Sequence, residues 1–479
     1  MILKAGHIDL KLFISGGMLF VLCLLSAMLL DLPALMLLPV LMCVAFLFLK
    51  DIRIAFYMLI FTLPVSFQFM EKYDFPDEPL MILNTVFFLF FCLYNQKRIQ
   101  MKGILLHPMF ISVMLTLVWL LITILMSKNT LLSFKFLLKK SWYIAPFFLF
   151  PLILFRDKQM IIRSFQWLFL SFFCIVLIVL IRFSAVGFAF DKVHDPVQPF
   201  FQNHVMYGSM VSIVVPFIVA ALFLSRKLSV QWLFSLAGFV IFLFAVYFSY
   251  SRAAWAAILF AMLCYAAVRL KMMHYFMLAF YVLVFGMVVW LSGKNTYLSY
   301  KPKFEKTIMH ESLEDHILAT IQGTDISSAE RYYRWIAALR MSRDHPVFGV
   351  GPNNFYDHYK PYTITSFKTW VSRNPERSTT HNYFLFMLVE QGVPGMLLYA
   401  ILIFIIFYYG QKVYHRQDDR FNKIVVMSAL CAIAAIFINN FFSELLETDK
   451  IGSIFYLSIA MIIAIDTRQR MTSISQKAS

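Results

Sequence analysis

Long apolar runs, separated by short polar stretches, extend along almost the whole chain. A helix needs about 20 apolar residues to cross the hydrocarbon core of a bilayer, and about 17 to 25 are tolerated. About fourteen such runs are present, and a count of twelve or thirteen also fits: 11–30, 33–49, 54–70, 79–94, 108–126, 141–155, 164–182, 206–224, 231–250, 253–268, 275–292, 383–408, 424–442 and 451–466. Three runs are short (33–49, 141–155 and 253–268), so one of them could be re-entrant. The pattern predicts an all-α polytopic membrane protein with about 12–14 transmembrane helices.

One long polar segment, residues 293–380, interrupts this pattern. It is too long for a simple connector between spans, so we expect it to fold over the bundle as a cap. It divides the chain into a transmembrane bundle of about eleven spans (1–292), the polar loop itself (293–380), and the C-terminal spans with their tail (381–479).

Within the polar segment, the sequence S-S-A-E-R-Y-Y-R-W-I-A-A-L-R-M-S-R (327–343) predicts one helix, which either of its first two serines can cap. The pair His345-Pro346 ends it, and the turn-rich G-V-G-P-N-N-F (349–355) follows. Its apolar stripe consists of Trp335, Ile336 and Leu339.

Lysine and arginine gather in alternate loops, and cytoplasmic loops are the ones that carry such an excess. This places both termini in the cytoplasm and residues 293–380 outside. The first apolar run has no clear cleavage site and leads straight into another span, so we expect it to be a transmembrane helix rather than a signal peptide. One loop breaks the charge rule, because S-F-K-F-L-L-K-K-S-W (133–142) falls on the outside with three lysines.

Composition excludes a soluble protein. Hydrophobic residues make up 61% of the 479 residues and charged residues only 14%, whereas soluble domains average about a quarter charged. The net charge of +16 is spread over short loops, so it does not form a nucleic-acid patch. The six cysteines all lie in apolar runs without a C-x-x-C pair, which argues against a disulfide framework or a thiolate zinc site.

Arginines are the first candidates for chemistry. Arg252 lies between two apolar runs at the predicted outer face, where a charge usually meets a cavity or a partner; the alternative is an arginine that reaches to the interface. Arg331 and Arg334 lie three residues apart on the predicted loop helix, so they share one side of it. Their planar guanidinium groups suit phosphate oxygens; the alternative is a solvated charged helix.

Two histidines stand where polar segments re-enter the membrane. His381 opens S-T-T-H-N-Y-F-L-F-M-L-V-E-Q-G-V-P-G (378–395), and a neutral imidazole can accept a proton from a hydroxyl. Glu390 lies nine residues further along the same span, where an unpaired carboxylate would be costly. His204, in F-Q-N-H-V-M-Y-G, enters another span from the same side. The alternative for both histidines is an interfacial structural role. No P-loop, H-E-x-x-H or G-x-S-x-G motif occurs.

Three segments in order resemble the shared region of the O-antigen ligase and polymerase family. S-R-A-A-W (251–255) is similar to its S-R-[GA]-[AG]-W block. R-Y-Y-R-W…H-P-V-F-G-V-G-P-N-N-F (331–355) is similar to its R-x-x-x-W…HP-x-x-G-x-G-x-x-x-F block. H-N-Y-F-L-F-M-L-V-E-Q-G-V-P-G (381–395) is similar to its H-N-x-x-L-x-x-L-x-E-x-G-x-x-G block. The resemblance covers about residues 200 to 410.

The resemblance implies a GT-C-like membrane glycosyltransferase of the bacterial inner membrane. Such enzymes move a glycan from undecaprenyl pyrophosphate to an acceptor sugar at the outer, periplasmic face, with no metal, nucleotide or other cofactor. It implies that Arg252 and Arg331 hold the pyrophosphate and that His381 is the general base. Arg334 has no fixed place in the pattern. Lys139 and Lys140 could add to the anion site; the alternative is pairing with lipid headgroups.

Three functions remain open at this point. We place first an O-antigen ligase, which would use a lipid A–core acceptor. The alternative is a polymerase, which would extend a lipid-linked repeat; the motifs do not separate the two. A polysaccharide flippase or other transporter is the third reading. Transporters usually place charges at mid-membrane in inverted repeats, whereas the polar residues here gather at one face and in one loop, which favours an enzyme.

The charge pattern makes a topological prediction. Reporter fusions at Lys97, Arg226 and Arg416 should report the cytoplasm, and a fusion near Asp325 should report the outside, because basic loops stay inside. Alkaline phosphatase and fluorescent-protein activities measure this. A cytoplasmic signal at Asp325 would contradict a site on the outer face.

Overall fold

The computed structural model describes residues 51–69, 73–95, 102–292, 326–363 and 379–478. Within these ranges, eleven helices are long and apolar enough to cross a bilayer. They are α4 (Asp77–Asn95), α6 (Pro108–Leu125), a continuous helix over 130–154, α9 (Lys158–Ala185), α10 (His204–Leu224), α11 (Val230–Phe248), α12 (Arg252–Arg269), α13 (Met273–Ser292), α17 (Tyr383–Arg416), α18 (Arg420–Asn439) and α19 (Asp449–Ala478). The prediction of an all-α polytopic membrane protein is confirmed. The spans predicted at 11–30 and 33–49 lie outside the described residues.

Polar caps set where the apolar helices begin. An asparagine, serine or aspartate precedes seven of them, and its side chain accepts a hydrogen bond from a backbone N–H of the first turn. These caps are Asn129, Asp157, Asn203, Ser229, Ser251, Asn382 and Asp419. Each one satisfies an N–H group that would otherwise lack a partner where the chain enters an apolar environment.

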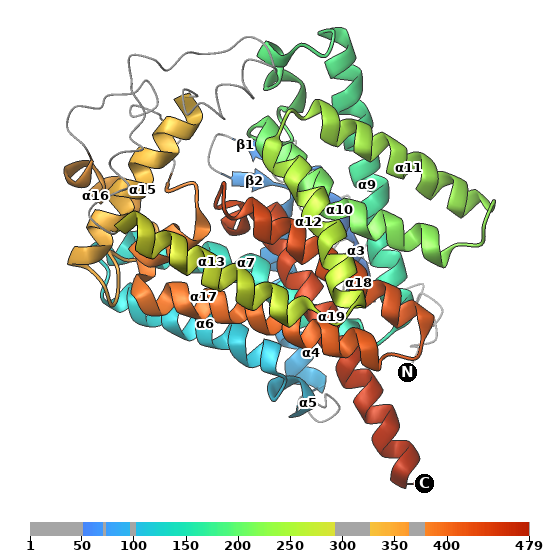
Figure 1. Cartoon of the computed structure of the whole chain (residues 1–479). Coiled ribbons are helices and arrows are strands. Elements are labelled where there is room, and N and C mark those ends of the chain that lie inside the picture. The colour runs from blue at the N-terminus through green and yellow to red at the C-terminus, as the bar shows by residue number, and fades with distance from the viewer. Residues whose placement is uncertain (1–50, 70–72, 96–101, 293–325, 364–378, 479) are drawn as a thin grey trace, which may run out of the picture. The chain divides into compact units, whose positions relative to one another are not determined.

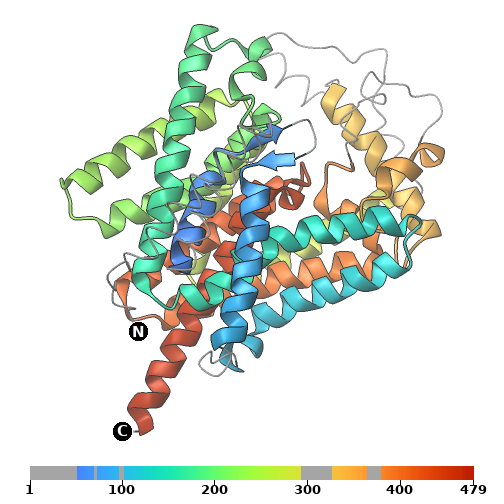
Figure 2. The same ribbon diagram turned by 180° about the vertical axis from the view of Figure 1, so that it is seen from behind.

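Two predicted elements differ from the structure. The run 54–70 forms only the helix α3 (Ile52–Thr62), and eleven residues rise about 16 Å, too little to cross a bilayer. Pro64 follows α3, and β1 (Phe67–Phe69) then pairs antiparallel with β2 (Tyr73–Phe75). The pair of strands β1 and β2 lies at the start of α4, as Figure 2 shows.

The predicted outer loop at 133–142 is wrong. These residues lie inside a helix formed by α7 (Thr130–Ile144), the π-helical η2 (Ala145–Leu149) and α8 (Phe150–Leu154). The sequence suggested a loop because of its lysines. A helix can carry them because Lys139 and Lys140 both meet carboxylates of other elements.

The C-terminal helices form the centre of the bundle. The membrane-length part of α19 is wholly buried and that of α18 largely so. Helix α18 packs against α10 and α12 (Figure 1). Both α12 and α18 bury several alanines, and small residues let helix backbones approach closely: Ala254, Ala257 and Ala261 on α12, and Ala429, Ala432 and Ala435 on α18. Helix α13 instead exposes apolar side chains such as Val282 and Phe285, as expected of a lipid-facing helix.

The loop helix is present where the sequence predicts it. Helix α15 (Ile326–Asp344) ends just before His345-Pro346 and packs against α17, which runs beside α6 (Figure 1). The short elements α16 (Phe355–His358) and η7 (Lys360–Tyr362) follow it. Buried side chains of α15, the glycine-containing loop, α16 and α17 form one hydrophobic cluster: Ala337, Ala338, Met341, Val350, Phe355, Tyr359 and Val389.

The loop 349–355 reaches α17 at a kink. The Gly351 N–H donates to the carbonyl of Glu390 at 3.0 Å, and the Val393 N–H donates to the carbonyl of Pro346 at 2.8 Å. Gly392 interrupts the helix with φ 73°, and a Cβ there would meet the backbone of Val347 at less than 3 Å. Glycine is therefore required both for the conformation and for the close approach.

This contact predicts a specific loss of stability. Gly392→Ala should destabilise the protein by more than about 1 kcal/mol, because the new Cβ is strained and clashes with backbone. Thermal unfolding in detergent measures it. Gly286→Ala is the matched control, since nothing lies within 4 Å of a Cβ at that position, and it should be neutral or slightly stabilising. Equal melting temperatures for the two variants would contradict the described packing.

Candidate functional site

His381 stands at the point where the long polar segment returns to the bundle. Its backbone is left-handed, with φ 50°, a conformation that non-glycine residues seldom adopt and that gathers at functional sites. The next residue, Asn382, caps α17 by accepting a hydrogen bond from the Leu385 N–H at 3.0 Å. The imidazole is 30% exposed, so a substrate can reach it.

A carboxylate faces the His381 ring. The Nδ1 atom lies 4.0 Å from Oε2 of Glu444, and the Thr379 hydroxyl donates to Oε1 of the same carboxylate. At 4.0 Å the two groups are at ion-pair distance and are not hydrogen-bonded, and Oε2 of Glu444 is buried without a hydrogen-bond partner. A carboxylate at this distance favours the protonated form of the imidazole electrostatically. Glu444 is not among the site residues that the sequence predicts. The available signal was the acidic turn E-L-L-E-T-D-K (444–450) between two apolar runs.

The turn after α18 fixes the start of α17. The Tyr383 N–H donates to the carbonyl of Asn440 at 2.7 Å, and the Asn382 side-chain amide donates to the carbonyl of Phe441 at 3.3 Å. Glu444 follows in the same turn. The carboxylate and the histidine are thus held by backbone contacts on both sides.

Helix α15 contacts the His381 segment from another direction. The Arg334 guanidinium donates to the carbonyl of Thr379 at 2.8 Å, and the Trp335 indole N–H donates to the carbonyl of Thr380 at 2.9 Å. Arg331 lies three and four residues before these two, so all three share one face of the helix. The structure therefore brings the face that carries Arg331 to the segment that carries His381. Arg331 is half-buried there, and Arg334 is buried.

Arg252 and His204 begin α12 and α10 at the same end of the bundle. Gly208 lies so close to Ser251 that a Cβ on the glycine would be 3.0 Å from the serine Cβ. The Ser209 hydroxyl hydrogen-bonds to Asn439 at the end of α18, at 2.9 Å, next to the turn that holds Tyr383. The His204 ring stacks edge-on with His194, with ring centroids 4.7 Å apart. These contacts place the starts of α10, α12 and α17 together.

The two predicted lysines are already ion-paired. Lys139 lies 3.6 to 3.8 Å from the carboxylates of Asp74, Glu78 and Asp449. These three carboxylates could hold a metal ion by their spacing, but the Lys139 ammonium supplies positive charge among them. Lys140 is buried and contacts Glu447 at 2.5 Å. Because three carboxylates surround the Lys139 ammonium and one pairs with Lys140, neither offers uncompensated charge to a pyrophosphate.

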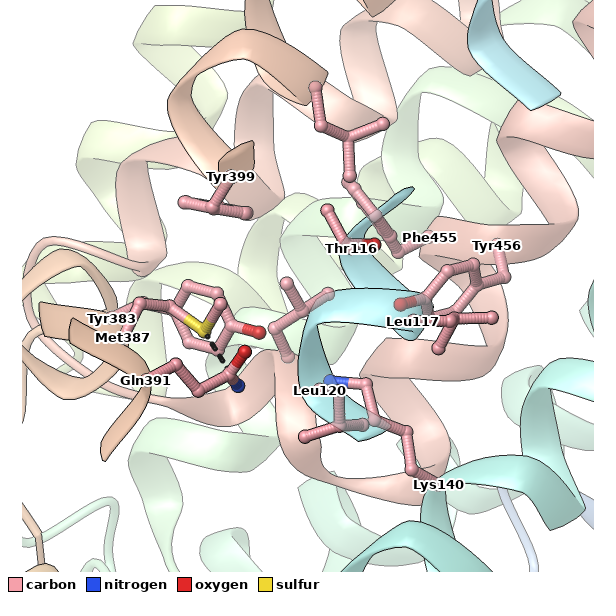
Figure 3. Close-up of a pocket in the computed structure, with 12 residues that line it drawn as sticks. Thr116, Leu117, Leu120, Lys140, Tyr383, Met387, Gln391, Tyr399, Phe455 and Tyr456 are labelled. Atoms are coloured by element: carbon pink, nitrogen blue, oxygen red, sulfur yellow. Dashed lines mark hydrogen bonds between the residues drawn. The ribbon is translucent and has the colours of Figure 1, made fainter. Parts of the chain in front are cut away.

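A small internal cavity of about 20 Å³ lies beside Tyr383 in the first turn of α17, which is room for a water molecule and not for a sugar. Its lining mixes Lys140, Tyr383, Gln391 and Tyr456 with apolar side chains (Figure 3). Glu447 beside it accepts hydrogen bonds from the hydroxyls of Tyr143, at 3.2 Å, and of Tyr383. The polar residues around the cavity are therefore bonded to one another and hold the first turn of α17 in place.

Glu390 is engaged by the glycine-containing loop. Its carboxylate accepts hydrogen bonds from the backbone N–H of Asn353 at 2.6 Å and of Phe355 at 3.2 Å. Both oxygens thereby hold the loop on α17. This explains a carboxylate at a buried position without a catalytic role.

The fold and site define an all-helical polytopic membrane protein with a histidine–carboxylate pair at one end of its bundle. Residues 237–400 match the family described as O-antigen ligase. The matched stretch contains Arg252, Arg331 and His381, so the resemblance predicted from the three blocks is confirmed. It supports a membrane glycosyltransferase activity of the O-antigen ligase or polymerase type, acting on lipid-linked glycans in general. No curated protein matches the chain.

The His381–Glu444 pair makes a prediction for turnover. His381→Ala should lower turnover about 10²- to 10⁴-fold, the usual contribution of a positioned base, with donor affinity nearly unchanged. In the wild type, activity should rise with pH as the imidazole loses its proton. Glu444→Gln should move this rise to lower pH, because the carboxylate favours the charged ring.

Turnover of purified protein, normalised to folded molecules, is the measurement. His415→Ala is the matched control, since His415 lies in the last turn of α17, where its ring hydrogen-bonds with the carbonyl of Val268 at 2.8 Å. The pH profile can distinguish His381 from His345, a second histidine near the loop 349–355, because burial and the nearby Lys128 lower the pKa of His345. Full turnover in His381→Ala would contradict the assignment.

Proposed function

We propose that this protein transfers a glycan from an undecaprenyl-pyrophosphate donor to an acceptor sugar, at the periplasmic face of the bacterial inner membrane. The observation that carries the proposal is the His381–Glu444 pair, held at the bundle end where α10, α12 and α17 begin. The acceptor is a lipid A–core sugar in this proposal, as in an O-antigen ligase. A GT-C-type fold with both termini in the cytoplasm is part of it.

The reaction follows from the chemistry of the donor. The acceptor hydroxyl oxygen forms a bond to the anomeric carbon, and the bond from that carbon to the pyrophosphate oxygen breaks. The hydroxyl proton passes to His381, and undecaprenyl pyrophosphate leaves with the electron pair. The negative charge that grows on the leaving group needs fixed cations. Arg252 and Arg331 are suited to this role without a metal, because guanidinium forks match phosphate oxygens.

A polymerase that extends a lipid-linked repeat is the alternative, since it differs only in the acceptor. A flippase is less well supported, because the residues suited to glycan transfer, Arg252, Arg331 and His381, belong to elements that meet at one end of the bundle.

Complementation tests the proposal and separates the two acceptors. The gene would be expressed in strains that lack either the O-antigen ligase or the polymerase, with lipopolysaccharide resolved on gels. Restored attachment of glycan to lipid A–core supports a ligase, and restored long chains in the second strain support a polymerase. Purified protein that leaves a lipid-linked donor unchanged with both acceptors would overturn the proposal.

The arginines give a separate prediction. Arg252→Ala and Arg331→Ala should each remove most transfer, and Arg→Lys at either position should restore little, because the bidentate fork is lost. Arg343→Lys on the same loop helix is the control, as its side chain is exposed, and it should behave as wild type. Donor binding and initial rates measure this. Near-full activity of Arg331→Lys would exclude a phosphate clamp there.

A further inference from the structure

The backbone at His381 needs support that its own sequence does not give. A left-handed histidine is strained and persists only where neighbouring contacts determine it. The Thr380 hydroxyl donates to the carbonyl of Asn382 at 2.8 Å, but this bond is local. The stronger constraint comes from outside, on the carbonyls of the two residues before His381.

Both of those carbonyls accept hydrogen bonds from one helix. Arg334 bonds Thr379 and Trp335 bonds Thr380. The Arg334 side chain is almost fully buried, at 3% exposed, so its charge is committed to this contact region and not to solvent. Ile336 and Met341 anchor the same helix in the core, which makes α15 a firm support.

We infer that Arg334 and Trp335 are positioning residues that couple the Arg331 face of α15 to the conformation of His381. This inference rests on the proposed function. Arg331 lies one turn before them on the same face, so the helix that would hold the donor pyrophosphate also sets the base. A movement of α15 on donor binding would reach the imidazole through two hydrogen bonds. Arg334, which the sequence offered as a phosphate ligand, acts through His381 instead.

Trp335→Phe is the sharpest test, because it removes one N–H donor and keeps an aromatic ring. We expect kcat to fall about tenfold, while KM for a lipid-linked donor stays within about twofold. The rate at which diethyl pyrocarbonate modifies His381, resolved by mass spectrometry, should change as well. Arg334→Lys should retain more activity than Arg334→Leu, because the Thr379 carbonyl needs only one donor.

Two matched controls lie in the same structure. Trp119→Phe removes an indole bond of 2.9 Å to the carbonyl of Gln391, further along α17. Arg340→Lys alters a bond of 3.3 Å to the carbonyl of Tyr362, further along α15. Both should leave kcat and the reactivity of His381 unchanged.

The outcomes separate the inference from the proposed function. An inactive wild type would refute the proposed function itself. An active wild type with unchanged kcat and His381 reactivity in Trp335→Phe would overturn the inference alone. A rise in donor KM in place of a fall in kcat would also overturn it, since α15 would then serve only the donor. An equal loss in Trp119→Phe would reduce the effect to general stability and overturn it too.

Discussion

The segment 379–383 must bring a chemically active side chain to the start of a membrane helix while each of its polar backbone groups finds a partner. In an apolar environment an unpaired backbone group costs several kcal/mol. The chain meets this constraint with contacts from two distant elements. Helix α15 binds the carbonyls of Thr379 and Thr380, and the turn after α18 binds Asn382 and Tyr383. The rest of the architecture holds these elements in place.

Charge pairing divides the polar residues into two groups. Lys139 and Lys140 are neutralised by carboxylates of α4, α19 and the turn before it, and they stabilise the bundle beneath the site. Glu390 likewise serves the backbone of the loop 349–355. Apart from these paired residues, the candidate site consists of Arg252, Arg331, His381 and Glu444. This smaller set has the composition that transfer from a pyrophosphate donor requires.

The sequence predicts much of the fold because hydropathy is local. An apolar run such as 206–224 predicts a membrane-spanning helix without reference to the rest of the chain, and the structure places α10 at His204–Leu224. The loop helix was also predictable from local sequence, because serines can cap its start and the pair His345-Pro346 follows its end. The run 54–70 misled because hydropathy does not register where a helix stops, and Thr62 ends this one. The lysines at 139 and 140 misled because their carboxylate partners, on β2, α4, α19 and the turn before α19, are distant in the sequence.

The site was predictable only in part. His381 and Arg331 stand in recognisable blocks, so their candidacy follows from local sequence. Glu444 lies 63 positions after His381 in an acidic turn without a motif, and only the folded chain shows that it faces the ring. Arg334 looked like a second phosphate ligand because it follows Arg331 by three positions. The burial of Arg334 and its hydrogen bond to the carbonyl of Thr379 depend on the tertiary structure, which the local sequence does not reveal.

The proposed mechanism requires that the donor binds where α15 and the start of α17 meet. The most direct measurement is an experimental structure of the purified protein in lipid nanodiscs with an undecaprenyl-pyrophosphate glycan bound. We expect pyrophosphate oxygens within hydrogen-bonding distance of Arg252 and Arg331, with the first sugar beside His381. A donor bound at the opposite end of the bundle, near Arg416 and Asp466, would contradict it.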